Sequence, residues 1–193
     1  IHPGYGFLSE NARFAQVVER CGLKFIGPSA KAMALWGDKL TAREAARKFG
    51  LPLLPGSEAL TDAAHAEREA ARVGFPVIIK ARGGGGGRGM RICRAKEDVR
   101  RAFESATAEA ANAFGNPEMY LERFVENPRH VEFQVLADEH GQVWTLGERE
   151  CSLQRRHQKL IEESPCVAMT EERRTEVGAA IRRAVSETGY TSL

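Results

Sequence analysis

The sequence lacks the marks of a secreted, membrane-spanning or disulfide-bonded protein. It has only four cysteines in 193 residues, and no two of them form a C-x-x-C pair. No signal peptide is recognisable, and no apolar run approaches the length of a membrane span. We therefore expect a protein of the reduced cytoplasm that has no membrane partner.

An excess of charge of one sign is also missing. Lysine and arginine number 28 against 26 aspartate and glutamate residues, so the net charge is only +2. That balance does not favour nucleic acid as the main partner. The basic residues are unevenly spread, because eight of them and only two acidic residues lie between positions 80 and 101. This distribution predicts a locally positive surface.

Two nucleotide-binding motifs are absent from the glycine-rich stretch of this basic region, VIIKARGGGGGRGM at 77–90. A P-loop needs Lys-Ser or Lys-Thr after its last glycine, whereas this chain has Arg-Gly-Met. Gly84, Gly86 and Gly89 satisfy G-x-G-x-x-G only because five glycines are adjacent, and a strand is expected after them where the motif needs a helix. Neither a P-loop nor a dinucleotide fingerprint is supported.

What the stretch does contain fits phosphate binding. Residues 77–79 read as a buried strand with Lys80 at its mouth, followed by glycines whose bare N–H groups can gather around an anion. Arg88 adds a second cation. A flexible linker is the alternative interpretation of a glycine run. Linkers rarely separate two strand-like segments, however, and here such segments lie at 77–79 and 90–93.

The remaining pattern predicts helices and strands. A helix capped by Ser9 leads to a short strand at 23–26, so residues 1–26 read as the end of an α/β layer. We expect further helices at 62–73, 97–114 and 170–189, two short helices between Ser29 and Phe49, and strands at 119–124, 130–138 and 143–150.

Cations and amides gather again in the run QRRHQK at 154–159. If this run is extended, His157 and Lys159 lie on one face. The run has no interleaved aromatic residues, which disfavours a nucleic-acid site, and we interpret it as an anion-binding patch. Lys39, at the start of a predicted helix, also hints at an anion nearby, although most such lysines face water.

Five segments together resemble the biotin carboxylase family, the ATP-grasp component of biotin-dependent acyl-CoA, pyruvate and related carboxylases. They are HPGYGFLSEN, GDK, VIIKARGGGGGRGM, ENPRHVEFQVLAD and ERECSLQRRHQKLIEESP, in this order. The match covers essentially the whole chain. The resemblance implies a mixed α/β and α+β fold of the ATP-grasp type, truncated. Residues 1–26 would end an N-terminal α/β domain, 27–53 form a helical linker, 54–124 form a lid with the glycine flap, and 125–193 begin a C-terminal subdomain.

The resemblance also implies the site residues. In such enzymes the counterparts of Lys39 and Lys80 hold nucleotide phosphates, and the loop at Gly86 and Gly87 closes over them. Lys159 matches a lysine at the bicarbonate site and is the implied catalytic residue. Further nucleotide-binding positions are implied at Glu122, Arg123, Phe124, Val125, His130, Gln154 and His157. The first four of these form a hinge whose backbone reads the adenine edge. Arg82 and Arg123 depart from the family pattern, which commonly has a small residue and a lysine there.

The implied reaction is the ATP-dependent carboxylation of biotin on a carrier protein, using bicarbonate through carboxyphosphate, with Mg²⁺ as cofactor. The implied partners are a biotin carboxyl carrier, a carboxyltransferase component and a second copy of the enzyme. Ligands for Mg²⁺ are expected beyond the matched region, so none is assigned here, and we expect this stretch alone to be inactive. Two alternatives stay open: another ATP-grasp carboxylate or bicarbonate ligase, and a non-catalytic nucleotide-binding or RNA-binding module.

Overall fold

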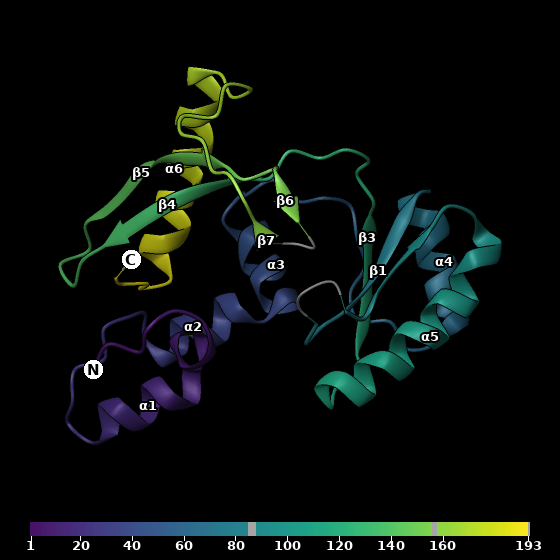
Figure 1. Cartoon of the computed structure of the whole chain (residues 1–193), viewed down its shortest axis with the longest axis horizontal. Coiled ribbons are helices and arrows are strands. Elements are labelled where there is room, and N and C mark those ends of the chain that lie inside the picture. Colours follow the sequence, from purple (N-terminus) through teal and green to yellow (C-terminus); the bar gives the residue numbers. More distant parts are fainter. Residues whose placement is uncertain (85–87, 156–157, 193) are drawn as a thin grey trace. The chain divides into compact units, whose positions relative to one another are not determined.

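The structure, a computed structural model, describes residues 1–84, 88–155 and 158–192. It divides into two compact units, and most of their elements are labelled in Figure 1. The first unit comprises Ile1–Pro52, Arg129–Leu153 and Leu160–Leu193. The second unit comprises Leu53–Pro128 and Gln154–Lys159. No helix among the described residues has the length and apolar character that crossing a bilayer requires.

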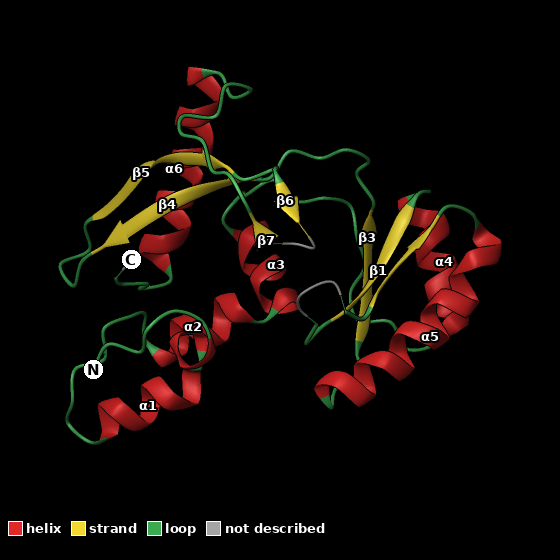
Figure 2. Ribbon diagram, viewed as in Figure 1, coloured by secondary structure: helices red, strands yellow, loops and turns green. Residues whose placement is uncertain are grey.

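The second unit is built around a three-stranded antiparallel sheet in the order β2-β1-β3. Helices α4 and α5 pack on one face of this sheet (Figure 2). The glycine-rich stretch connects β1 to β2, as the sequence predicted for a strand pair. The elements of this unit are α4 (Ala63–Val73), β1 (Val77–Ala81), β2 (Met90–Cys93), α5 (Lys96–Phe114), β3 (Met119–Arg123), β6 (Gln154–Arg155) and β7 (Gln158–Lys159).

Alternation along β1 explains the core of the second unit. Val77, Ile79 and Ala81 are fully buried and point toward the helices, whereas Ile78 and Lys80 lie on the opposite face and are only half-buried. The helices present alanine-rich faces to the sheet, and these small side chains let the helix backbones approach it closely. The buried alanines of α4 and α5 are Ala63, Ala66, Ala70, Ala106 and Ala110.

The first unit contains an antiparallel hairpin, β4 with β5, against which α6 packs. Side-chain oxygens cap helices of this unit. Asp38 Oδ1 accepts hydrogen bonds from the N–H groups of Leu40 (3.2 Å) and Thr41 (3.0 Å), and Thr170 Oγ1 accepts one from Arg173 (3.3 Å). The elements of this unit are η1 (Phe7–Glu10), α1 (Ala12–Arg20), α2 (Ala30–Gly37), α3 (Lys39–Lys48), β4 (Val131–Ala137), β5 (Val143–Glu150) and α6 (Glu171–Glu187).

Two predictions for residues 1–26 are wrong. Ser9 does not cap α1, because it lies inside the short 3₁₀ helix η1; Asn11 is the cap, and its Oδ1 accepts a hydrogen bond from Phe14 N–H at 2.9 Å. No strand forms at 23–26, although Ile26 N–H donates to Ile1 C=O at 2.9 Å. The apolar character there reflects Phe25, which is buried and packs edge-on against Phe14.

Candidate functional site

Lys80 and Glu122 meet on the open face of the second unit's sheet. Lys80 lies within β1 and not just beyond it, one residue before the strand ends. Its Nζ is 2.5 Å from Glu122 Oε2 on β3. The register explains the contact, because Lys80 stands opposite Tyr120 and Ile78 opposite Glu122, so that the two charged residues are diagonal neighbours. Glu122 is only 8% exposed, so this carboxylate depends on its cation partner.

Strand β3 is held along both edges. One edge pairs with β1. Along the other edge, Ser57 N–H donates to Leu121 C=O at 2.9 Å, and Arg123 N–H donates to Pro55 C=O at 2.8 Å. The buried Ser57 Oγ accepts a hydrogen bond from Leu121 N–H at 3.0 Å. The predicted hinge therefore starts from a rigid strand end.

At the hinge itself, backbone polar groups point alternately to the two edges of β3. Phe124 N–H turns toward β1 and donates to Pro76 C=O at 2.9 Å. Arg123 and Val125 therefore share the other edge, where Pro55 has no N–H to donate back to the Arg123 carbonyl. Val125 is 40% exposed. The Arg123 C=O and the Val125 N–H thus form an acceptor and a donor, two residues apart, along one edge.

The described ends of the glycine loop need their glycines. Gly89 has φ +68°, and a Cβ there would lie 2.8 Å from Ala81 Cβ. A Cβ on Gly84 would lie 3.0 Å from Arg88 C=O. The loop base is closed by hydrogen bonds from Ala81 N–H to Gly89 C=O and from Gly84 N–H to Ala81 C=O. Gly86 and Gly87, the two positions predicted to cover phosphate, lie outside the described residues, so that prediction stays a prediction.

The described residues of the run at 154–159 form the two short strands β6 and β7. Strands β6 and β7 pair with each other, which sets Gln154 opposite Lys159 and Arg155 opposite Gln158. The structure therefore brings together Gln154 and Lys159, two of the predicted site residues. His157 lies outside the described residues, and its predicted proximity to Lys159 stays a prediction.

Two predicted site residues belong to the first unit. Lys39 is the first residue of α3, directly after the capping Asp38, and is half-buried. His130 precedes β4 and is exposed. Its N–H donates to Ser152 Oγ at 2.9 Å, its C=O accepts from Cys151 N–H at 2.7 Å, and its Nε2 lies 3.7 Å from a Glu132 oxygen. His130 is thus fixed at the backbone while its ring stays accessible.

The comparisons with known proteins agree with this arrangement. Residues 38–193 match the family described as "Carbamoyl-phosphate synthase L chain, ATP binding domain", and residues 1–33 match "Biotin carboxylase, N-terminal domain". The chain therefore belongs to the family of this ATP-binding domain, and its relatives include biotin carboxylases. The resemblance read from the sequence motifs is therefore confirmed, as is an ATP-grasp fold of mixed helix and sheet.

Relatives in this family are similar over nearly the whole chain. Biotin carboxylase of Haemophilus influenzae is 52% identical across 98% of this chain, which spans 43% of that protein. The 2-oxoglutarate carboxylase small subunit of Hydrogenobacter thermophilus is 49% identical across 100% of this chain, which spans 41% of that protein. The chain therefore spans less than half the length of these relatives.

Solved structures of family members have the same fold. The biotin carboxylase domain dimer of the Hydrogenobacter 2-oxoglutarate carboxylase, in complex with MgADP, ADP and bicarbonate, superposes with a TM-score of 0.95. It is 49% identical and covers 100% of this chain, which covers 43% of that one. Biotin carboxylase of Campylobacter jejuni, in a βγ-ATP complex, superposes with a TM-score of 0.94 at 48% identity, over 99% of this chain and 43% of its own.

The sequence interpretation missed an ion-pair network on the β4–β5 hairpin. Arg149 of β5 lies between two carboxylates, 2.6 Å from Glu132 and 2.6 Å from Glu162. Cys151 places its Sγ near the same carboxylates, within 4.8 Å. The pairing of Glu132 with Arg149 is a consequence of hairpin register, and strict alternation at 130–138 was the only available signal.

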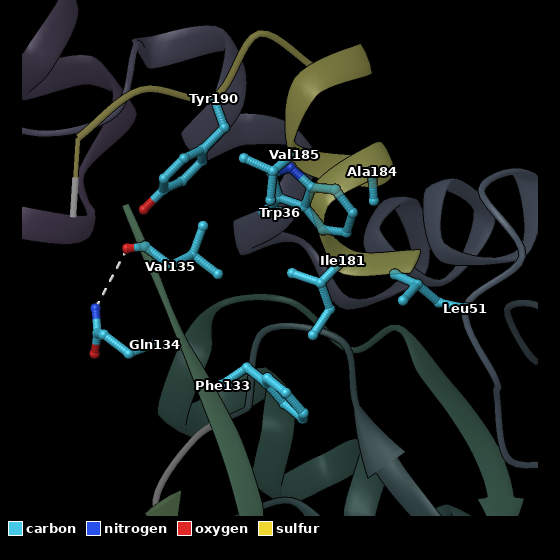
Figure 3. A pocket seen from close by; sticks show the side chains of 9 residues that line it. All are labelled: Trp36, Leu51, Phe133, Gln134, Val135, Ile181, Ala184, Val185 and Tyr190. Atoms are coloured by element: carbon cyan, nitrogen blue, oxygen red, sulfur yellow. Dashed lines mark hydrogen bonds between the residues drawn. The ribbon is translucent and has the colours of Figure 1, made fainter. Parts of the chain in front are cut away.

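Two other features, a cavity and a buried cysteine, lie apart from the predicted site residues. An apolar cavity of about 350 Å³ in the first unit is lined by side chains such as Trp36, Phe133 and Tyr190 (Figure 3), and none of the predicted site residues lines it. Burial raises the pKa of the Cys93 thiol to about 11, which leaves it protonated and unreactive at neutral pH.

Proposed function

We propose that this chain carries the ATP-binding part of a biotin carboxylase, which uses ATP and bicarbonate to carboxylate biotin on a carrier protein. We further assign residues 1–26 to the end of an N-terminal domain, 27–53 to a linker, 54–124 to the lid and 125–193 to the beginning of a C-terminal subdomain. The support is the family membership, the relatives named as carboxylases and the complexes of similar structures with MgADP and bicarbonate.

The observation that carries the proposal is the arrangement at the end of β3. The Arg123 C=O can accept a hydrogen bond from the 6-amino group of adenine while the Val125 N–H donates to the adjacent ring nitrogen. Lys80 and Glu122 lie next to this edge on the same sheet, 2.5 Å apart. The first glycine of the loop, Gly83, is three residues beyond Lys80. Base-reading groups, a cation and an N–H-rich loop thus follow one another within the second unit.

The other roles follow the chemistry of the side chains. Lys39 and Lys80 supply cations for the phosphates, with Gly86 and Gly87 as the covering loop. His130, Gln154 and His157 supply further polar contacts to the nucleotide. Lys159 is assigned to bicarbonate, and its exposed ammonium lies opposite the Gln154 amide in the β6–β7 pair.

In the proposed reaction, a bicarbonate oxygen attacks the γ-phosphorus of ATP, the bond from that phosphorus to the β-phosphate oxygen breaks, and ADP leaves. The product is carboxyphosphate, whose carboxyl group passes to the ureido nitrogen of biotin while inorganic phosphate leaves and the ureido N–H loses its proton. Phosphoryl transfer depends mainly on positioning and on neutralising the charge of the transferred group. Lys80 would neutralise nucleotide charge, and Lys159 would orient bicarbonate and stabilise the nascent carboxyphosphate.

Mg²⁺ supplies charge neutralisation at the phosphates when bound, but no residue described here is assigned as its ligand. Glu132 and Glu162 already hold the Arg149 guanidinium between them, which satisfies the charge that a metal would otherwise balance. We place the Mg²⁺ ligands, the carrier and the carboxyltransferase contacts outside this chain, and we propose a homo-oligomeric, cytoplasmic enzyme. The Hydrogenobacter relative is described as a domain dimer.

The test contrasts two lysines in the full-length protein that contains this chain. Lys80→Met keeps the apolar stem and removes the charge, so we expect weaker ATP-analogue binding and a rate loss on the order of 10²–10³. Lys159→Gln should leave nucleotide affinity unchanged while bicarbonate-dependent ATP cleavage and biotin carboxylation fall together. Lys96→Met, at an exposed lysine of α5, is the matched control and should change neither quantity.

Two outcomes would reject these assignments. Unchanged ATP kinetics in Lys80→Met would mean that Lys80 has only a structural role. Loss of nucleotide affinity in Lys159→Gln with an unaltered bicarbonate KM would place Lys159 on the nucleotide. ATP cleavage by the wild type that biotin does not affect would favour another ATP-grasp ligase, which is consistent with the broader family match at 38–193.

A further inference from the structure

The Arg123 side chain leaves the hinge and ends at the C-terminus of helix α4. Its Nη2 donates to Val73 C=O at 2.6 Å, and its Nη1 donates to Phe75 C=O at 3.3 Å. Val73 is the last residue of α4. Carbonyl groups at a helix C-terminus carry partial negative charge and lack intrahelical donors, so a guanidinium is favourable there. Hydrogen bonds from a charged donor are also stronger than neutral ones.

The turn that follows α4 leaves space for this guanidinium. Gly74 follows α4 with φ +84°, a conformation that favours glycine. A Cβ on Gly74 would lie 2.7 Å from Arg123 Nη2 and 3.4 Å from Cζ. The absence of a side chain at Gly74 therefore leaves the space that the guanidinium occupies.

The same turn holds both sides of the hinge. Pro76 C=O accepts a hydrogen bond from Phe124 N–H at 2.9 Å, as described above. On the other side, Arg72 Nη2 donates to Gly56 C=O at 2.8 Å, next to the Pro55 carbonyl that receives Arg123 N–H. Residues 72–76 thus hold the segments on both sides of the hinge. The Arg123 guanidinium adds a side-chain link from the hinge to the same turn.

We propose that Arg123 is a positioning residue for base selection. Its side chain anchors the hinge to the end of α4 and so holds its own carbonyl at the edge from which the base is read. The proposal rests on the proposed function. A purine with a 6-amino group donates to that carbonyl, whereas a 6-oxo purine presents an acceptor to it and is disfavoured. Loosening the anchor should therefore reduce the preference for adenine over guanine nucleotides.

The test measures kcat/KM for ATP and GTP in the full-length protein at saturating bicarbonate. Arg123→Met removes the donors and keeps an apolar stem, and we expect the ATP-to-GTP ratio to fall on the order of tenfold through the KM for ATP. The bicarbonate KM should not change. Arg123→Lys keeps the cation but loses the two-pronged donor, so we expect an intermediate ratio.

Arg100→Met is the matched control. Arg100 pairs with Glu67 at 2.9 Å between α5 and α4 of the same unit, so its loss disturbs the unit but not the hinge. We expect an unchanged ratio for this variant. Denaturant midpoints are measured for all variants, so that a loss of stability is separated from a loss of selectivity.

A wild-type ATP-to-GTP ratio in Arg123→Met, whatever its stability, would overturn the proposal. If Arg123→Met does not fold, a wild-type ratio in Arg123→Lys would overturn it equally. A wild-type protein that neither binds nor cleaves adenine nucleotides would instead reject the proposed function, so the two failures are distinguishable.

Discussion

Strand β1 of the second unit and strand β4 of the first unit both have apolar residues at every second position, but these residues are buried to different depths. In β1, Val77 and Ile79 are 0% exposed. In β4, the alternating apolar residues Val131, Phe133 and Val135 are only half-buried. Two helices cover the three-stranded sheet, whereas among the described residues of the first unit α6 is the main helix packed on the hairpin. Alternation thus identifies the inward face, and the number of covering elements decides how deeply it is buried.

The two regions also differ in what their charged residues do. On β5 the fully buried residue Glu148 is a carboxylate, held by the Arg174 guanidinium at 2.7 Å and by Cys166 N–H at 3.1 Å. In the second unit the strand residues that face the helices are apolar, and the ion pair of Lys80 with the buried Glu122 lies on the opposite face of the sheet. Apolar packing therefore stabilises the unit proposed to bind the nucleotide, while the hairpin depends on hydrogen-bonded charge.

The largest effect expected from this comparison is on the core of the second unit. Ile79→Ala leaves a cavity beneath two helices and should lower the free energy of unfolding by about 2–5 kcal/mol. Ile92→Ala, at a 46% exposed isoleucine of β2, is the control and should change it by less than about 1 kcal/mol. Urea unfolding of both variants decides this. Equal losses would mean that the burial contrast within the sheet is wrong.

A smaller effect is expected at the hairpin, and it depends on pH. Hydrogen bonds from Arg174 hold the pKa of Glu148 below its ordinary value of 4.5. The pair therefore stabilises the fold fully above about pH 4.5, and this contribution is lost as pH falls through the lowered pKa. Glu148→Gln should cost about 1–3 kcal/mol at pH 7 and weaken the acid dependence of unfolding.

Glu176→Gln is the matched control for that experiment, because Glu176 pairs with Arg173 at the exposed surface of α6. It should leave both the stability and its acid dependence close to those of the wild type. Should Glu148→Gln show the same acid unfolding curve as the unaltered protein, the buried pair would not be what stabilises the hairpin.

The smallest effect concerns the start of α1 in the first unit. Asn11→Ala removes the observed cap and should lower stability by about 1 kcal/mol. Ser9→Ala removes the residue that the sequence favoured, and its hydroxyl donates only to Gly6 C=O at 3.0 Å. Thermal unfolding should therefore separate the two variants. A larger loss of stability in Ser9→Ala than in Asn11→Ala would mean that Ser9 is the cap after all.

Local signals were enough for most of the fold. The helix that begins after Thr170 and the two strands around the glycines were predictable because local side-chain and backbone preferences determine them. The prediction of Ser9 as the cap was wrong because Ser9 and Asn11, which both favour cap positions, lie only two residues apart. The residue at which the helix begins decides which of them is the cap. Residues 23–26 misled because an apolar tetrapeptide becomes a strand only when another strand pairs with it.

The site was predicted as a set of residues, but not as an arrangement. The contact of Lys80 with Glu122 depends on the register of β1 with β3, and that of Glu132 with Arg149 on the register of β4 with β5. The open carbonyl at Arg123 depends on Pro55, which lies opposite it and almost seventy positions earlier in the chain. Such long-range pairings leave no mark in a single sequence.

The central claim is that this chain binds ATP for a bicarbonate-dependent carboxylation of biotin. The most direct measurement is the rate of ADP formation by the full-length protein with MgATP, as bicarbonate and biotin are added in turn. The account predicts that ADP formation requires bicarbonate, rises with biotin, and falls on the order of 10²–10³ in Lys80→Met. ADP formation that is independent of both bicarbonate and biotin would contradict it.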